Sequence, residues 1–144
     1  MHSTAKNNIR WLRIAYWAGA VLDAVAFLQM MFPSFTSEAM GVSFVVTPEY
    51  EIAMQFGAAL MLAWTVLLIW ADRKPVERKG ILPITLIIIV MNFITFSQSA
   101  HLGRIPIEKL VPQLMVILAV FILYVFAWLY TRGVALQGQK GAFQ

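Results

Sequence analysis

The chain has 144 residues, of which 60% are hydrophobic and only 12% carry a formal charge, and it contains no cysteine. An average soluble domain is about 45–50% apolar and about 25% charged. This composition excludes a disordered segment, a disulfide-stabilised scaffold and an ordinary water-soluble enzyme, and it predicts an integral membrane protein.

Four apolar stretches are each close to the length that crosses a bilayer, which is about 20 helical residues. They occupy about 11–32, 52–70, 81–100 and 107–130. We expect helices, because backbone polar groups in hydrocarbon must be satisfied internally and the alternating pattern of barrel strands is absent from the sequence. The predicted fold is all-α: a bundle of four transmembrane helices in a single domain, residues 1–144, with a flexible tail at about 134–144.

Local signals support these boundaries. Thr47-Pro48-Glu49 is typical of a helix N-cap followed by proline in the first turn. The other prolines stand near predicted helix starts, at the end of the first span or in a loop, namely Pro33, Pro75, Pro83, Pro106 and Pro112. The basic start of the first span resembles a signal peptide, but its apolar run continues past Ala24-Val25-Ala26, so we expect this span to stay uncleaved.

Basic residues are distributed unevenly between the two predicted sides. Nine of the 11 Lys and Arg belong to the N-terminal region, the loop 72–79 or the C-terminal tail, whereas Arg104 and Lys109 lie on the opposite side. Cytoplasmic segments are enriched in such cations, so we expect both termini to be cytoplasmic, in the plasma (inner) membrane of a prokaryote. The net charge of +4 then reflects orientation and contact with membrane lipids, and no nucleic-acid-binding motif is present.

Polar residues within the spans are concentrated between the midplane and the non-cytoplasmic surface. A rise of about 1.5 Å per residue places Asp23 and Asn92 about 16–18 Å from the cytoplasmic ends of their spans, with Gln55 farther out. Because a polar group inside a bilayer is costly, these three residues are candidates for a ligand or proton site. Beyond them we expect the rim of an outer pocket, formed by Gln29, Gln98, His101 and Gln113.

These depths predict a pocket between the helices that opens to the non-cytoplasmic side and ends at Asp23. No Lys or Arg lies at that depth, so we expect Asp23 to be neutral, hydrated or countered by a ligand. The alternative is a structural carboxyl that is hydrogen-bonded to Asn92 and joins two helices. Stripes of small residues, including Gly19 and Gly57, predict close packing of the first two spans or contact with a second copy.

Three functions fit this pattern. We expect a non-enzymatic module that binds a lipid or small molecule, or that serves as an accessory subunit of a homo-oligomer or larger membrane complex. A proton- or cation-coupled transporter that uses Asp23 is the second hypothesis. A membrane enzyme acting on a lipophilic substrate is the third, although Asp23 and His101 differ in predicted depth by about 12 Å, which disfavours direct cooperation.

No catalytic residue, metal site or cofactor is predicted. The chain has two His and no Cys, which gives ligation of haem or a soft metal poor support, and hydrolase, phosphate-loop and zinc motifs are absent from the sequence. The four-span layout is similar to that of DoxX-like and other small four-helix membrane families, but no motif in the sequence identifies one.

Overall fold

The computed structural model describes residues 2–34, 47–103 and 105–141, with side chains described between Ile9 and Tyr130 of these ranges. Four long helices make up most of this part of the chain: α1 (His2–Met31), α3 (Pro48–Asp72), α4 (Ile81–His101) and α5 (Ile107–Gly141). Each contains a segment long and apolar enough to span a membrane, namely Ile9–Met31, Pro48–Asp72, Ile81–His101 and Ile107–Tyr130. The all-helical architecture therefore agrees with the sequence prediction.

The predicted N-cap of α3 is confirmed. The Thr47 side chain accepts a hydrogen bond of 3.3 Å from the backbone N–H of Tyr50, and Pro48 occupies the first helical turn. Glu49 and Glu51 lie in that same turn, where negative charge complements the positive end of the helix dipole. The helix starts at Thr47 because the side chain satisfies a backbone donor that would otherwise lack a partner.

The last helix differs from the prediction at both ends. Pro112 lies inside α5 rather than at its start, so the helix lacks the hydrogen bond that this proline cannot donate. At the other end, α5 continues to Gly141, through most of the segment for which the sequence predicts a flexible tail. Extending an existing helix costs much less free energy than starting one, which favours this continuation.

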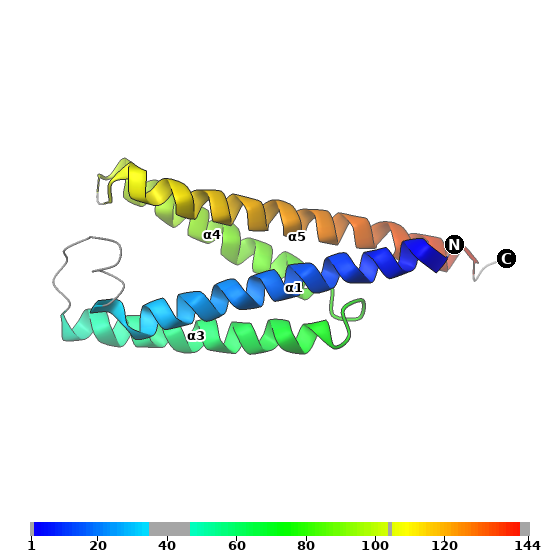
Figure 1. Ribbon diagram of the computed structural model, residues 1–144, viewed down its shortest axis with the longest axis horizontal. Helices are drawn as coiled ribbons and strands as arrows, with labels where there is room; N and C mark the ends of the chain where they lie inside the picture. The colour runs from blue at the N-terminus through cyan, green and yellow to red at the C-terminus, as the bar shows by residue number, and fades with distance from the viewer. Residues whose placement is uncertain (1, 35–46, 104, 142–144) are drawn as a thin grey trace.

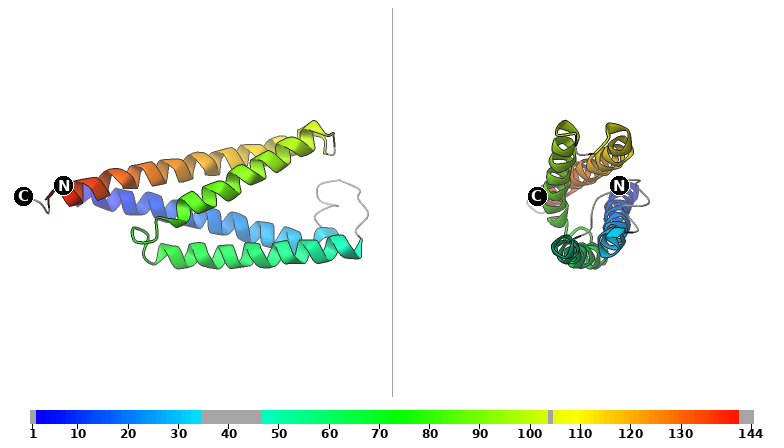
Figure 2. Two further views of the ribbon diagram at one scale, coloured as in Figure 1. Left: turned by 180° about the vertical axis from the view of Figure 1, so that it is seen from behind. Right: turned by 90° about the vertical axis from the view of Figure 1, so that its left-hand side faces the viewer.

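The helices are arranged as two pairs (Figure 1). The most extensive interface is that between α1 and α3, and smaller interfaces join α4 to α5 and α1 to α5. The start of α1, the end of α5 and the loop that connects α3 to α4 lie at one end of the molecule (Figures 1 and 2). We call this the closed end.

All four helices contribute to a hydrophobic core near the closed end. The core residues come from the first two thirds of α1, the second half of α3, the start of α4 and the second half of α5; they are Leu12, Ala15, Tyr16, Ala20, Leu68, Ala71, Leu82, Tyr124 and Ala127. Trp11 of α1 also meets Phe126 of α5 edge to face, with ring centroids 5.2 Å apart. Packing between the two helix pairs is therefore concentrated in one half of the bundle.

Away from the closed end the two pairs diverge. Figure 1 shows the pair α1 and α3 separating from the pair α4 and α5 toward the opposite end, and Figure 2 shows the same divergence from behind. On α4, every residue from Met91 to Thr95 is exposed, although five successive residues cover all faces of a helix. We call this half of the molecule the open half.

Candidate functional site

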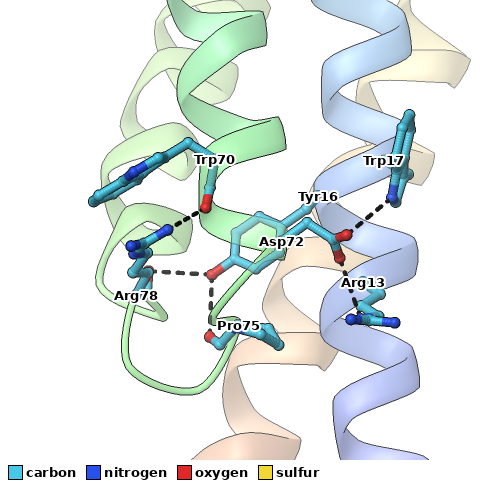
Figure 3. Close-up of polar contacts among 7 residues, drawn as sticks. All are labelled: Arg13, Tyr16, Trp17, Trp70, Asp72, Pro75 and Arg78. Carbon is cyan, nitrogen blue, oxygen red and sulfur yellow. Dashed lines mark hydrogen bonds and ion pairs between the residues drawn. The ribbon is translucent and has the colours of Figure 1, made fainter.

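The closed end is held together by polar contacts around Asp72, the last residue of α3 (Figure 3). Its Oδ1 atom lies 3.5 Å from Nε of Arg13, and its Oδ2 atom accepts a hydrogen bond of 3.3 Å from the indole N–H of Trp17. Both partners belong to α1. Asp72 therefore links the end of α3 to the first half of α1.

The loop that follows is fixed by a tyrosine and an arginine (Figure 3). Tyr16 is fully buried, and its hydroxyl donates toward the carbonyl oxygens of Pro75, at 3.4 Å, and Arg78, at 3.1 Å. The guanidinium of Arg78 lies 3.3 Å from the centre of the Trp70 ring and donates a hydrogen bond to the Trp70 carbonyl. These contacts hold the loop against α1 and the end of α3.

Sequence reasoning missed this cluster. From the sequence, the charged loop 72–79 is interpreted only as a determinant of orientation. The contacts that α1 makes with Asp72 and with the loop carbonyls join residues 55 to 62 positions apart along the chain, so no local spacing indicates that they meet. The available signal was the polar tip of each aromatic ring, since a buried Tyr or Trp usually finds a hydrogen-bond partner.

Asp23 lies three residues beyond Ala20, the last residue that α1 contributes to the core. It follows Gly19 by four residues on α1 and shares the face that buries Tyr16 and Ala20. The side chain is half-buried, and its Oδ2 atom is fully buried without a hydrogen-bond partner among the described residues. The structure thus places the predicted acid at the base of the open half, with an unsatisfied acceptor.

Two other predicted residues face the same interior. Asn92 follows Thr85 by seven residues on α4, which places the two within about 20° of one face. Thr85 is buried there and accepts a hydrogen bond of 3.3 Å from the indole N–H of Trp64 on α3, whereas Asn92 is exposed. On α5, Gln113 is half-buried on the face that buries Tyr124.

Asn92 and Asp23 are not hydrogen-bonded to each other in the described part of the chain. The structural alternative, in which this hydrogen bond joins two helices, therefore has no support from the contacts. Asn92 is exposed and lies beyond the midpoint of α4, toward the end at which the two helix pairs diverge (Figure 1).

The remaining predicted polar residues lie elsewhere. Gln55 shares an exposed face of α3 with Leu62 and Ile69, away from Trp64 and α4. Gln98 and His101 are exposed on the face of α4 that also exposes Ile87 and other apolar side chains. Gln29 is half-buried near the end of α1. The structure does not bring these four residues together with Asp23.

The two predicted packing glycines differ in their surroundings. Gly19 is buried, and a Cβ atom there would overlap Oη of Tyr124 on α5 and lie 2.9 Å from Cδ1 of Leu68 on α3. Gly57 is half-buried, and a Cβ atom there would lie 3.0 Å from Sδ of Met30 on α1. Gly19 therefore allows α5 and α3 to approach α1 one helical turn from Asp23, on the side of the closed end.

Tyr124 is a site residue that the sequence did not indicate. It is fully buried, and its hydroxyl has no hydrogen-bond partner among the described residues. Because Oη occupies the space that a Cβ atom at Gly19 would fill, it lies about one helical turn from Asp23 along the same face of α1. A tyrosine in an apolar run is interpreted as core, and only its contact with Gly19 identifies it as part of a site.

Within the described residues, no group of three or more His, Cys, Asp or Glu could hold a metal ion. No family model, no curated protein and no solved structure matches the chain. The fold and site thus define a bundle of four helices of membrane-spanning length, with a buried carboxyl oxygen beyond the core that joins the two helix pairs.

Proposed function

We propose that the chain is an integral membrane protein whose closed end faces the cytoplasm. Support comes from four helices of spanning length and from the large apolar side chains that they expose on all sides of the bundle, such as Phe56, Ile87 and Met115. Arg13 and the cations of the 73–80 loop lie at the closed end, together with Trp11 and Trp70. Cytoplasmic loops favour Lys and Arg, and membrane interfaces favour Trp.

We propose that its function is to bind a lipid or small molecule in the open half, with Asp23 at the base of the site. The observation that carries this proposal is the coincidence of two features. The two helix pairs diverge away from the closed end (Figure 1), and three polar residues lie on the faces of α1, α4 and α5 that bury side chains nearer that end, namely Asp23, Asn92 and Gln113. Polar residues in a membrane bundle typically face such an interior and mark a binding site or pathway.

The packed core at the closed end favours binding of a ligand from one side of the membrane over transport across it. Leu12, Leu68 and Leu82 fill the bundle core there together with Tyr124, and all four side chains are fully buried. Catalysis is disfavoured, because His101 lies on an exposed face of α4 and does not approach Asp23.

Cysteine accessibility tests the proposal, because the chain has no Cys and a single introduced thiol is unique. Asn92→Cys and Met91→Cys place that thiol at nearly one depth on different faces of α4, and both positions are exposed. A charged, membrane-impermeant thiol reagent added to the non-cytoplasmic side should modify Asn92→Cys at least about tenfold faster than Met91→Cys, because a thiolate forms only in contact with water.

Equal protection of the two thiols would show that the interior-facing position is as dry as the lipid-facing one, and would overturn the proposal. Val76→Cys, on the exposed surface of the 73–80 loop, is the control for orientation. It should react only when the reagent is added to the cytoplasmic side.

A further inference from the structure

Two buried oxygen atoms near the base of the open half have no hydrogen-bond partner in the part of the chain that the structure describes. Among the described residues, three buried side-chain oxygens make no hydrogen bond: Asp23 Oδ2, Asp72 Oδ1 and Tyr124 Oη. The Asp72 atom faces the guanidinium of Arg13 at 3.5 Å, so its charge is compensated. The other two atoms are not compensated, and they come from facing helices, α1 and α5.

Leaving these groups unsatisfied costs free energy. A buried hydroxyl or carboxyl without a hydrogen bond destabilises the fold, and an ionised carboxylate without a counter-charge costs more. Replacing Tyr124 by phenylalanine would remove the unpaired hydroxyl and keep the ring that packs in the core. A partner from outside the chain that supplies hydrogen bonds would offset both costs at once.

The two atoms define the chemistry of that partner. An ionised Asp23 only accepts hydrogen bonds, and the Tyr124 oxygen can accept one as well. On α1 the nearest described cation is Arg13, which precedes Asp23 by about 15 Å along the helix and is paired with Asp72. A positively charged group with at least two N–H donors satisfies both acceptors and neutralises the carboxylate.

The surroundings indicate that the partner also has an apolar body. Phe27 follows Asp23 by four residues on the same face of α1 and is half-exposed, and Phe93 is exposed on α4 in the open half. A hydrocarbon chain attached to a charged head at Asp23 would therefore lie along apolar side chains of α1 such as Phe27. An amphiphile matches this sequence of environments better than a small hydrated ion.

We propose that Asp23 and Tyr124 together bind the head group of an amphiphilic primary amine in its protonated form. The ammonium donates one hydrogen bond to the Asp23 carboxylate and one to the Tyr124 hydroxyl oxygen, and the hydrocarbon chain extends into the open half. This inference rests on the proposed binding function and names the chemical class of the ligand.

The test uses reaction of Asp23 with dicyclohexylcarbodiimide, which modifies carboxyl groups in apolar surroundings. The full-length protein in lipid vesicles is labelled and measured by intact mass, and Asp23→Asn identifies the signal that belongs to this residue. Three competitors share one chain length: dodecylammonium, dodecyltrimethylammonium and dodecanol. The second carries the charge without N–H donors, and the third donates without charge.

Dodecylammonium should protect Asp23 at a membrane concentration about 10- to 100-fold lower than either other competitor, which is the range for a hydrogen bond to a charged group. In Tyr124→Phe, half-protection should require about 10- to 100-fold more dodecylammonium, because one hydrogen bond from the charged ammonium is lost. Gln98→Leu removes a polar group from an exposed face of α4 and should leave protection unchanged.

Equal protection by dodecanol or by dodecyltrimethylammonium would overturn the assignment of an amine, and so would an unaltered response of Tyr124→Phe. Absence of labelling in the unliganded protein would also overturn it. If any of these three contrary results is found while Asn92→Cys is modified rapidly, the proposed binding function stands and only the assignment of the ligand class fails. If Asn92→Cys is also unreactive, both proposals fail.

Discussion

The contact between Gly19 and Tyr124 leads to a quantitative prediction. Replacing a helix-interior glycine by alanine usually stabilises a helix by about 0.5–1 kcal/mol. At Gly19, however, the new methyl group would overlap Oη of Tyr124 and lie 2.9 Å from Cδ1 of Leu68, and both neighbours are fully buried. Overpacking of this kind costs about 1–3 kcal/mol. We therefore expect Gly19→Ala to lower the free energy of unfolding by about 1–2 kcal/mol.

A double-mutant cycle isolates the cause. Tyr124→Phe removes Oη, after which the closest remaining atom of that ring is Cζ, 3.1 Å from the added methyl group. Gly19→Ala should then cost about 1 kcal/mol less than it does in the parent protein, because the overlap with Oη is removed while Cδ1 of Leu68 remains 2.9 Å from the added methyl group. Tyr124→Phe alone should be neutral or stabilising in the absence of ligand, because it removes an unpaired buried hydroxyl.

The measurement is unfolding in mixed micelles by titration with dodecyl sulfate, followed by helical circular dichroism. Two glycines provide matched controls. A Cβ at Gly57 would meet only the flexible side chain of Met30, and a Cβ at Gly80 would meet nothing within 4 Å, so both alanine variants should be close to neutral. If Gly19→Ala is as stable as the parent, or if its effect is unchanged by Tyr124→Phe, the packing described for α1 and α5 is incorrect.

Two further predictions concern the ends of α3. Thr47→Ala should lower the free energy of unfolding by about 1 kcal/mol because the N-cap hydrogen bond is lost, whereas Thr47→Ser should retain most of it; unfolding titrations of the two variants check this. Tyr16→Phe should cost about 1 kcal/mol and speed tryptic cleavage in the 73–80 loop, because the hydroxyl that holds two loop carbonyls is removed. An unaltered cleavage rate, equal to that of the control Tyr130→Phe, would contradict the role assigned to Tyr16.

Much of the fold could be predicted because its signals are local. A run of about 20 apolar residues defines a span, and Thr47 followed by Pro48 defines a helix start, without reference to other parts of the chain. The continuation of α5 to Gly141 was missed, because the glycine- and glutamine-rich end of the chain is not apolar and carries no sign of a helix.

The candidate site was harder to predict from the sequence, because it depends on the face of each helix that a side chain occupies as well as on the depth of that side chain along the span. Counting residues from the span ends ranks Asp23, Asn92 and Gln55 by depth, but it does not give the face of each helix that meets its neighbours. The structure shows Asn92 on the face of the buried Thr85 and Gln55 on a face that exposes Leu62. Tyr124 was missed because its importance comes from α1, where Gly19 makes room for its hydroxyl.

The pairing of the helices also bears on how the chain assembles. The most extensive interface joins α1 to α3, and another joins α4 to α5, so most contacts form between partners that lie near each other in the sequence. Each pair can fold as a helical hairpin, and the two hairpins then associate through the single core that they share. Since that core is confined to the closed end, a hinge motion between the hairpins can widen or narrow the region around Asp23 while every helix keeps its backbone hydrogen bonds.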